Sequence, residues 1–433
     1  MARMLVIADD FTGALDTGIQ FAKKGICTQI ILDHELMHDN LDSGVQVAVI
    51  DSETRHLPAD EAGQKVYQLV LAARKKGIEM IYKKTDSALR GNIGSELTAQ
   101  LAATGQNILV YIPAFPKMGR TTLNGVQYVN RVPVAESVFG CDPFEPVTSS
   151  FIPDIIARQS NVAVKVVTGK DREREVYIQD QPTIYVFDAE KDEDLKKIAG
   201  EMKQKNVNFL AGCAGFAEFL PELLQTEGKS TEEVKADCGM IVISGSINPI
   251  TIRQIRRARE AGVPCYTLNQ DQKIARYCAG VAEMSSFIEE LKNVYRKERQ
   301  IIIETADSRG YGESAPANCD FLRSGSLLLD PRERQMVADN VAEIVHAMVQ
   351  GGMKGLYVFI GGDTMAAVMK RLGCRQIIPL KELMPGIVLS RACCRLGEIM
   401  AISKSGGFGE EDTLVNLLHE AEKERETYAA GWH

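Results

Sequence analysis

Short apolar runs alternate with amphipathic stretches along the first half of the chain. A continuous run such as residues 4–8 is typical of a strand that is buried on both faces, as in a parallel sheet. Amphipathic stretches at residues 15–24 and 59–76, ended by Gly25 and Gly77, predict helices between such strands. The strands predicted in this half are residues 4–8, 28–32, 45–51, 80–84, 107–113, 183–188 and 209–212.

The alternation is interrupted once and then resumes. Residues 221–237 are polar and predict a linker, which we place at about residues 226–237. Beyond it we expect strands at 239–244, 265–268, 300–304 and 356–360, and helices at 251–261, 332–349 and 365–372. The pattern predicts two α/β domains, residues 1–225 and 238–433, each a mainly parallel sheet covered by helices, with an active site in the cleft between them.

Composition and charge exclude several classes of function. The 433 residues carry 50 Lys and Arg against 58 Asp and Glu, a net charge of −8, so we expect no nucleic-acid partner. An anionic substrate would need locally placed cations. No run approaches about 18 apolar residues, and the start of the chain does not read as a signal peptide. With ten cysteines and no CxxC pair, we expect a cytoplasmic protein with reduced thiols that does not enter a membrane.

The first predicted strand ends in two acids. Asp9 and Asp10 precede a Phe-Thr-Gly-Ala turn and the first helix. Carboxylates at a strand end can take a proton, hold a metal or accept hydrogen bonds from hydroxyls. They would equally serve as the cap and first-turn acid of the helix. Ligands in parallel α/β folds bind beyond the carboxyl ends of strands, and this position favours the functional interpretation.

A denser polar cluster follows the strand at 80–84. Residues 83–92 contain Lys84, Thr85, Asp86, Ser87 and Arg90, a mixture of signs and small residues typical of a binding loop. Lysine and arginine suit a carboxylate or a phosphate, and aspartate suits a hydroxyl.

Two further stretches follow predicted strands. Arg55 is a weaker candidate for the same crevice as the cluster at 83–92. Residues 113–122 would present Lys117 and Arg120 from a loop constrained by two prolines, although an ordinary connecting loop is an equal alternative.

Three turns of small residues predict phosphate binding in the second domain. They comprise Ser244-Gly245-Ser246, Gly361-Gly362-Asp363-Thr364 and the segment 404–409 with Gly406 and Gly407. Backbone amides can cradle a phosphate where no Cβ intervenes and a helix begins behind the turn. Neither a GxxxxGK[ST] loop nor a complete GxGxxG fingerprint is present, so this is neither a P-loop nor a dinucleotide fold.

Residues 34–38, HELMH, match the HExxH pattern of zinc proteases. That site needs both histidines one turn apart on a long helix and a third ligand. The stretch between the flanking predicted strands is too short for such a helix, and no other histidine precedes His56. We interpret the match as coincidence and assign no metal ligands.

Taken together, these motifs resemble the four-carbon acid sugar kinase family. The matching stretches are IADDFTGALDTG, KKTDSALRGNIGSEL, PAFPKMGRTT, VISGSINP, FIGGDTMAAV and SKSGGFGEEDTL, in order from Ile7 to Leu414. The resemblance implies a sugar-acid-binding N-terminal domain and a nucleotide-binding C-terminal domain. It implies transfer of the ATP γ-phosphate to the terminal hydroxyl of acids such as D-threonate, D-erythronate or 3-oxo-tetronate.

The resemblance also implies roles for individual residues. Substrate contacts would come from Asp9, Arg55 and the Lys84-Thr85-Asp86-Ser87 loop, and nucleotide contacts from Ser244 or Ser246, from Gly361 through Thr364, and from Gly407. Ala88 stands where many members have Thr, and Asp363 where Glu is common. The DTG at 16–18 is closer to the threonate and erythronate kinases than to the oxo-tetronate branch.

The expected reaction is ATP- and Mg²⁺-dependent phosphorylation of the 4-hydroxyl of a tetronate, D-threonate or D-erythronate first. Arg55, Lys84 or Arg90 would hold the carboxylate, and Asp86 or Asp10 would orient the hydroxyl and take its proton. The alternatives are a 3-oxo-tetronate kinase, a nicotinamide-dependent sugar-acid dehydrogenase and a non-catalytic sugar-acid-binding protein. The oligomeric state is left open, with a homodimer as one alternative.

Overall fold

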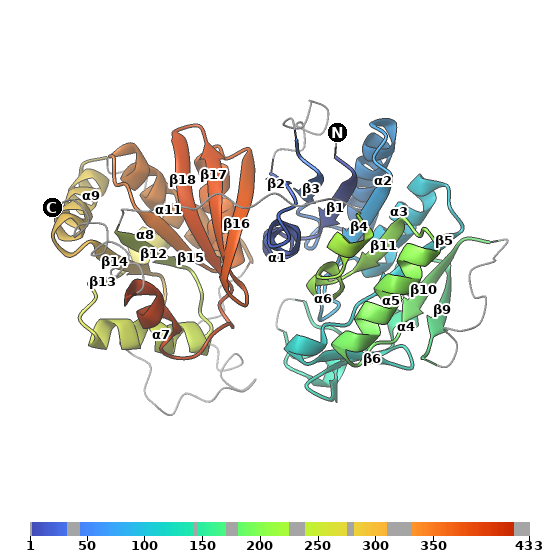
Figure 1. The fold of residues 1–433 in the computed structure, drawn as a ribbon. Helices are drawn as coiled ribbons and strands as arrows, with labels where there is room; N and C mark the ends of the chain where they lie inside the picture. Colours follow the sequence, from blue (N-terminus) through green and yellow to red (C-terminus); the bar gives the residue numbers. More distant parts are fainter. Residues whose placement is uncertain are drawn as a thin grey trace. The chain divides into compact units, whose positions relative to one another are not determined.

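The chain divides into two units, residues 1–230 and 231–433 (Figure 1). The computed structural model describes residues 2–32, 44–142, 145–169, 181–224, 239–274, 281–309 and 331–419. The expected linker at 226–237 and the HELMH segment at 34–38 lie outside the described residues. The exact domain boundaries therefore stay a prediction.

The first unit is built on a parallel sheet. Its described strands lie in the order β2-β3-β1-β4-β11-β5-β10-β9, and every pairing among them is parallel. The strands predicted for this half are confirmed to within two residues at either end. The observed bounds are β1 Met4–Ala8, β2 Thr28–Ile31, β3 Val47–Asp51, β4 Met80–Lys84, β5 Ile108–Ile112, β10 Thr183–Phe187 and β11 Phe209–Gly212. The edge strand β9, Ala163–Val167, was not predicted.

Helices pack on this sheet because its strands are apolar on both faces. Leu5 and Ile7 of β1 pack with Val66 and Val70 of α2 in one core, while α1 packs against β1, β2 and β3. Helix α1 begins four residues before the predicted start because Asp10 caps it, accepting from the Gly13 amide at 2.9 Å. The helices are α1 Phe11–Ala22, α2 Ala59–Lys75, α3 Ile93–Thr104, α4 Ile152–Ala157, α5 Asp192–Gln204 and α6 Ala214–Ala217.

A small antiparallel sheet was not predicted. It comprises β6 Arg120–Leu123, β7 Val126–Val129 and β8 Val132–Pro133. The expected loop at 113–122 therefore contains the short helix η2 Pro116–Met118 and then enters β6. Lys117 is held on the surface by Glu218 at 2.6 Å.

The second unit carries a mixed sheet. Its described strands lie in the order β13-β14-β12-β15-β18-β17-β16, parallel from β13 to β18 and antiparallel through β18, β17 and β16. The four predicted strands correspond to β12–β15, whereas the long hairpins β16–β18 were not predicted. The bounds are β12 Met240–Ser244, β13 Cys265–Thr267, β14 Gln300–Glu304, β15 Leu356–Ile360, β16 Gln376–Met384, β17 Ile387–Cys394 and β18 Gly397–Lys404.

Helices cover both faces of this second sheet. Ile255 of α7 and Leu414 pack on one face with Val242, Val358 and Ile402. Helix α9 contacts β14, and helix α12 contacts β15. Helix α11 packs on α8, α9 and α12. No helix in the described part of the chain is long and apolar enough to cross a membrane. The helices are α7 Pro249–Glu260, α8 Gln270–Ile274, α9 Val281–Glu298, α11 Pro331–Gln350 and α12 Gly362–Arg371.

Candidate functional site

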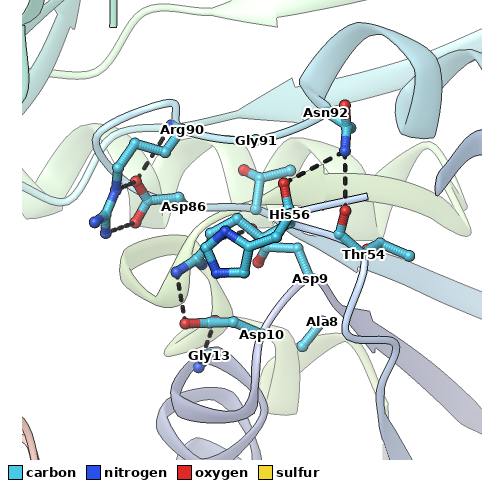
Figure 2. A network of polar contacts seen from close by, with 12 residues as sticks. Ala8, Asp9, Asp10, Gly13, Thr54, His56, Asp86, Arg90, Gly91 and Asn92 are labelled. Carbon is cyan, nitrogen blue, oxygen red and sulfur yellow. Dashed lines mark hydrogen bonds and ion pairs between the residues drawn. The ribbon is translucent and has the colours of Figure 1, made fainter. Parts of the chain in front are cut away.

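The strand order of the first unit creates a crevice at the end of β1. The chain runs from β1 to β2 and β3 on one side, and then crosses β1 to form β4 on the other side. Ligands of open α/β sheets bind where the order reverses in this way, beyond the carboxyl ends of the strands. The segments that follow β1, β3 and β4 therefore converge, and they carry the polar residues singled out in the sequence (Figure 2).

Arg55 ties the β1 and β3 ends together. Its guanidinium donates from Nε to Asp9 Oδ2 at 2.9 Å and from Nη1 to Asp10 Oδ2 at 2.6 Å. Asp9 is 1% exposed, and the side chain of Arg55 is 9% exposed. A planar fork of donors is suited to holding two carboxylates in fixed positions. The weaker candidate of the sequence analysis is thus central to the geometry.

The two lysines at the end of β4 point to opposite faces of the sheet, because side chains alternate along a strand. Lys83 contacts Glu96 of α3 at 3.0 Å, with both side chains buried. Lys84 lies beside α1, where its Nζ is 4.0 Å from Asp9 Oδ1. A Cβ added to Gly13 would lie 2.5 Å from that Nζ, so the glycine makes room for Lys84. Lys84 belongs to the crevice, and Lys83 supports the sheet.

One oxygen of Asp9 is left for a ligand. Asp9 Oδ2 accepts from Arg55, whereas Oδ1 is buried and has no hydrogen-bond partner among the described residues. Burial would raise the pKa of Asp9, but Arg55 and Lys84 outweigh burial, and the pKa lies below its usual value. A buried, ionised and partly unsatisfied carboxylate is an acceptor suited to a substrate hydroxyl.

Asp86 forms a bidentate pair with Arg90. Arg90 donates from Nε to Asp86 Oδ2 at 2.7 Å and from Nη2 to Oδ1 at 3.1 Å. Burial would raise the pKa of Asp86, but Arg90 and Arg55 lower it far below its usual range, so the carboxylate stays ionised. Thr85 is buried against Tyr111, 3.2 Å away, and Ser87 contributes its carbonyl to Gln127 at 2.9 Å. Thr85 is therefore buried within the sheet, Ser87 is fixed through its backbone, and Asp86 and Arg90 form the charged part of the predicted loop.

Asn92 fixes the loop that carries Arg55. Its side-chain amide donates to the carbonyls of Thr54 at 2.9 Å and Leu57 at 2.8 Å. Gly91 has a φ of +86°, a conformation that favours glycine, and it lies against the Arg55 backbone. Asn92 therefore connects the β4–α3 loop to the β3–α2 loop, as its contact with Thr54 shows (Figure 2).

A pocket of about 340 Å³ opens beside these residues. That volume is within the range of small-molecule sites. Arg55, Arg90 and Arg158 contribute cationic groups to its wall, with Asn92 and Gln159 as neutral donors and acceptors. Glu145 also lines the pocket, so its wall carries both signs of charge and is suited to a small polar molecule.

The second unit brings its three predicted turns together. Strands β12, β15 and β18 are adjacent and parallel, so their carboxyl ends lie at one edge. A Cβ on Gly245 would lie 1.9 Å from Thr364 Oγ1, and one on Gly406 would lie 2.2 Å from Ser246 Oγ. Gly361, with a φ of +116°, precedes α12 and adjoins the Ser246 amide. The turns pack so closely that only glycine fits at these positions.

Side chains fix the last of these turns. Thr251 donates to the Gly406 carbonyl at 2.7 Å, and Gln254 donates to the Glu410 carbonyl at 2.7 Å. Gly407 lies open, with only Asn248 Nδ2 at 3.4 Å from an added Cβ. Gly362, Asp363 and Thr364 form the first turn of α12, with Asp363 exposed. A helix N-terminus at a glycine-lined edge is suited to phosphate binding. The amides of Gly245 and Gly361 already donate to the carbonyls of Ile360 and Lys404, each at 3.1 Å.

The roles of Glu96 and Asn92 and the pairing of Lys83 were not predicted from the sequence. One signal was available: Glu96 and Gln100 share the buried face of α3 with Leu97 and Leu101. A charged residue on an apolar helix face needs a buried partner.

Two family models match the chain. The sugar-binding N-terminal domain matches residues 4–220, and the nucleotide-binding C-terminal domain matches residues 241–414. A solved structure of a Salmonella typhimurium protein described as a putative tRNA synthase has the same fold, with a TM-score of 0.78 and 23% identity over 97% of this chain and 100% of that one.

Curated relatives cover nearly the whole chain. A D-threonate kinase of Salmonella typhimurium is 32% identical over 97% of this chain and 99% of its own length. A D-erythronate kinase of Heliobacterium modesticaldum is 28% identical over 96% of this chain and 97% of its own length. A 3-oxo-tetronate kinase of Methylobacterium radiotolerans is 27% identical over 95% of this chain and 97% of its own length.

The two α/β units and these matches define the class of protein as a two-domain kinase. The chain belongs to the four-carbon acid sugar kinase family. The dehydrogenase and non-catalytic alternatives find no support among these relatives.

Replacing either lysine of β4 should lower the free energy of unfolding, but by different amounts. Lys83→Met leaves Glu96 buried without its partner and should lower the free energy of unfolding by about 3–5 kcal/mol. Lys84→Met should cost clearly less, because Arg55 still pairs with Asp9. Urea unfolding of both variants measures the difference, and equal losses would contradict the assignment of Lys83 to the scaffold.

Proposed function

We propose that this kinase uses Mg-ATP to phosphorylate the 4-hydroxyl of a four-carbon sugar acid, with D-threonate or D-erythronate as the substrate. The observation that carries the proposal is the crevice at β1, where Asp9 keeps a buried acceptor oxygen beside Lys84. A hydroxy acid offers the complementary groups, a carboxylate for the cations and hydroxyls for the acids.

The cations of the crevice differ in how strongly they are already paired. Arg55 is shared by two carboxylates and Arg90 is held by Asp86, whereas Lys84 reaches its nearest acid only at 4.0 Å. Lys84 is therefore the cation with most capacity for an added anion, and we assign the substrate carboxylate to Lys84 with Arg55 beside it. Asp9 Oδ1 would accept from a hydroxyl of the same molecule.

Asp86 is assigned as the group that orients the reacting hydroxyl, with Asp10 as the second candidate. Phosphoryl transfer passes through a loose transition state, so the nucleophile needs positioning more than early deprotonation. The low pKa that Arg90 and Arg55 give to Asp86 keeps it an acceptor at every physiological pH. Asp10 already caps α1 and binds Arg55, which leaves it less capacity for this role.

The glycine-lined edge of the second unit is assigned to ATP. At Gly245 and Gly406 a side chain would fill the space between the turns, so glycine keeps this edge open to a phosphate. The residues assigned to this edge are Ser244, Ser246, Gly361 to Thr364, Gly406 and Gly407. Mg²⁺ would neutralise the phosphate charge. It commonly keeps several waters and binds substrate phosphates with one or two carboxylates, rather than an all-protein cage.

The D-threonate and D-erythronate assignments rest on relatives that are 32% and 28% identical to this chain, whereas a 3-oxo-tetronate kinase is 27% identical. Purified protein with Mg-ATP should release ADP rapidly with D-threonate or D-erythronate and slowly with 3-oxo-tetronates or D-glycerate. A coupled assay of ADP release measures this. Fastest release with a 3-oxo-tetronate would move the substrate to that class, and release with none of these acids would contradict the proposal.

Replacement of Asp86 should separate turnover from nucleotide binding. Asp86→Asn removes the charge that orients the hydroxyl, so kcat should fall by about 10²–10⁴-fold. Affinity for Mg-ADP should stay within about twofold, because the nucleotide is assigned to the other unit. Steady-state kinetics and calorimetry measure both.

Asp60→Asn, an exposed change on α2, is the matched control for Asp86→Asn and should leave both quantities unchanged. Unchanged turnover in Asp86→Asn would remove Asp86 from this role. Arg90 loses its ionised partner in that variant, so circular dichroism should first show that the fold is retained.

A further inference from the structure

Lys404, the first residue of the segment 404–409, is a buried cation. It is the last residue of β18, and it is 2% exposed. Its Nζ donates to the carbonyl of Ser405 at 3.2 Å, which places the ammonium at the carboxyl end of the strand. The next residues, Gly406 and Gly407, form the turn that packs on Ser246 and Asn248. The charge therefore lies at the edge assigned to the nucleotide phosphates.

Strand register puts Lys404 in one row with Ser244. Ile360 pairs with Ser244 on one side and with Lys404 on the other, in parallel strands, so the three side chains share one face of the sheet. The hydroxyl of Ser244 is buried and has no hydrogen-bond partner among the described residues. Two strand spacings of about 4.8 Å separate the backbones of the pair. A donor without a partner and a cation thus flank Ile360.

The surroundings of Lys404 supply no counter-charge. Within the described part of the chain it forms no ion pair, and Ile360 of β15 and Ile387 of β17 flank it in the sheet. On this face α7 and the segment 413–419 contribute Ile255 and Leu414 to the core. The charged residues of α7 form ion pairs with other acids, among them Arg253 with Glu411 at 2.8 Å and Arg257 with Asp412 at 3.2 Å.

Burial is the only cause that lowers the pKa of Lys404, to about 8. An ammonium held in an apolar site without an anion costs free energy, and such a cost persists where function requires the charge. Because we assign ATP to the edge around Lys404, its phosphates would supply the counter-charge.

We propose that Lys404 binds the phosphate chain of the nucleotide, with the Ser244 hydroxyl as the neighbouring donor. The inference rests on the proposed assignment of ATP to this edge and adds the one side-chain cation that the glycine turns lack. Backbone amides select phosphate by geometry, and a buried ammonium adds charge that offsets the negative phosphates. Lys404 would thus contribute to affinity for ADP and ATP.

The test compares Lys404→Met with the wild-type chain by calorimetric titration with Mg-ADP. Loss of a charge-assisted contact should weaken binding by about 10–100-fold. Without nucleotide, the variant should unfold at the same temperature as the wild type or higher, because an apolar side chain replaces an uncompensated buried charge. A purely structural lysine predicts the reverse, a lower unfolding temperature with unchanged affinity.

Lys370→Met, an exposed change on α12, is the matched control and should leave ADP affinity unaltered. The two possible failures are distinguishable. Wild-type protein that does not bind Mg-ADP would overturn the assignment of the nucleotide to this unit. Wild-type binding with undiminished affinity in Lys404→Met would overturn the role of Lys404 alone.

A pH series gives a second and independent readout. Phosphates favour the protonated lysine, so wild-type affinity for Mg-ADP should fall as pH rises above about 8. Lys404→Arg keeps its charge throughout this range, so its affinity for Mg-ADP should not fall with pH. Lys404→Met should bind Mg-ADP weakly at every pH. The nucleotide phosphates titrate near pH 6 and stay constant here. An identical pH dependence in wild type and Lys404→Arg would contradict the proposal.

Discussion

Buried charges at the carboxyl ends of parallel strands must be compensated one by one, and the crevice of the first unit depends on how Arg55 does this. Its guanidinium donates one hydrogen bond to Asp9 Oδ2 and another to Asp10 Oδ2. These two bonds fix the end of β1 against the loop after β3. Among the described residues, no group donates a hydrogen bond to Asp9 Oδ1. The same ion pairs that make the buried cluster stable therefore create the acceptor to which we assign the substrate.

The alternation of side chains along β4 separates support from recognition. Lys83 and Lys84 are neighbours in sequence, but one is buried against Glu96 beneath the sheet and the other lies beside Asp9 and α1. The second unit uses a different device, since its edge is formed mainly by glycines packed against Thr364 and Ser246. Side-chain charge in the first unit and backbone amides in the second match the different chemistry of a hydroxy acid and a polyphosphate.

Much of this could be predicted from sequence, because apolar runs and the turns after them report the carboxyl edge of a parallel sheet. The positions of Asp9, Asp86 and the three glycine turns followed from that rule. The hairpins β16–β18 did not, because mixed burial along these strands interrupts their periodicity. Pairings such as Arg55 with Asp9, or Asn92 with the Thr54 carbonyl, join residues about 40 apart, and no local pattern encodes them.

The central claim is that the hydroxyl at carbon 4 of a four-carbon acid receives the phosphoryl group. The most direct measurement is phosphorus NMR of the product formed from Mg-ATP and D-threonate or D-erythronate, recorded with proton coupling. The account predicts a phosphomonoester signal split by the two protons of the terminal CH₂ group. A signal split by a single proton would place the phosphate on carbon 2 or 3, and would contradict the account.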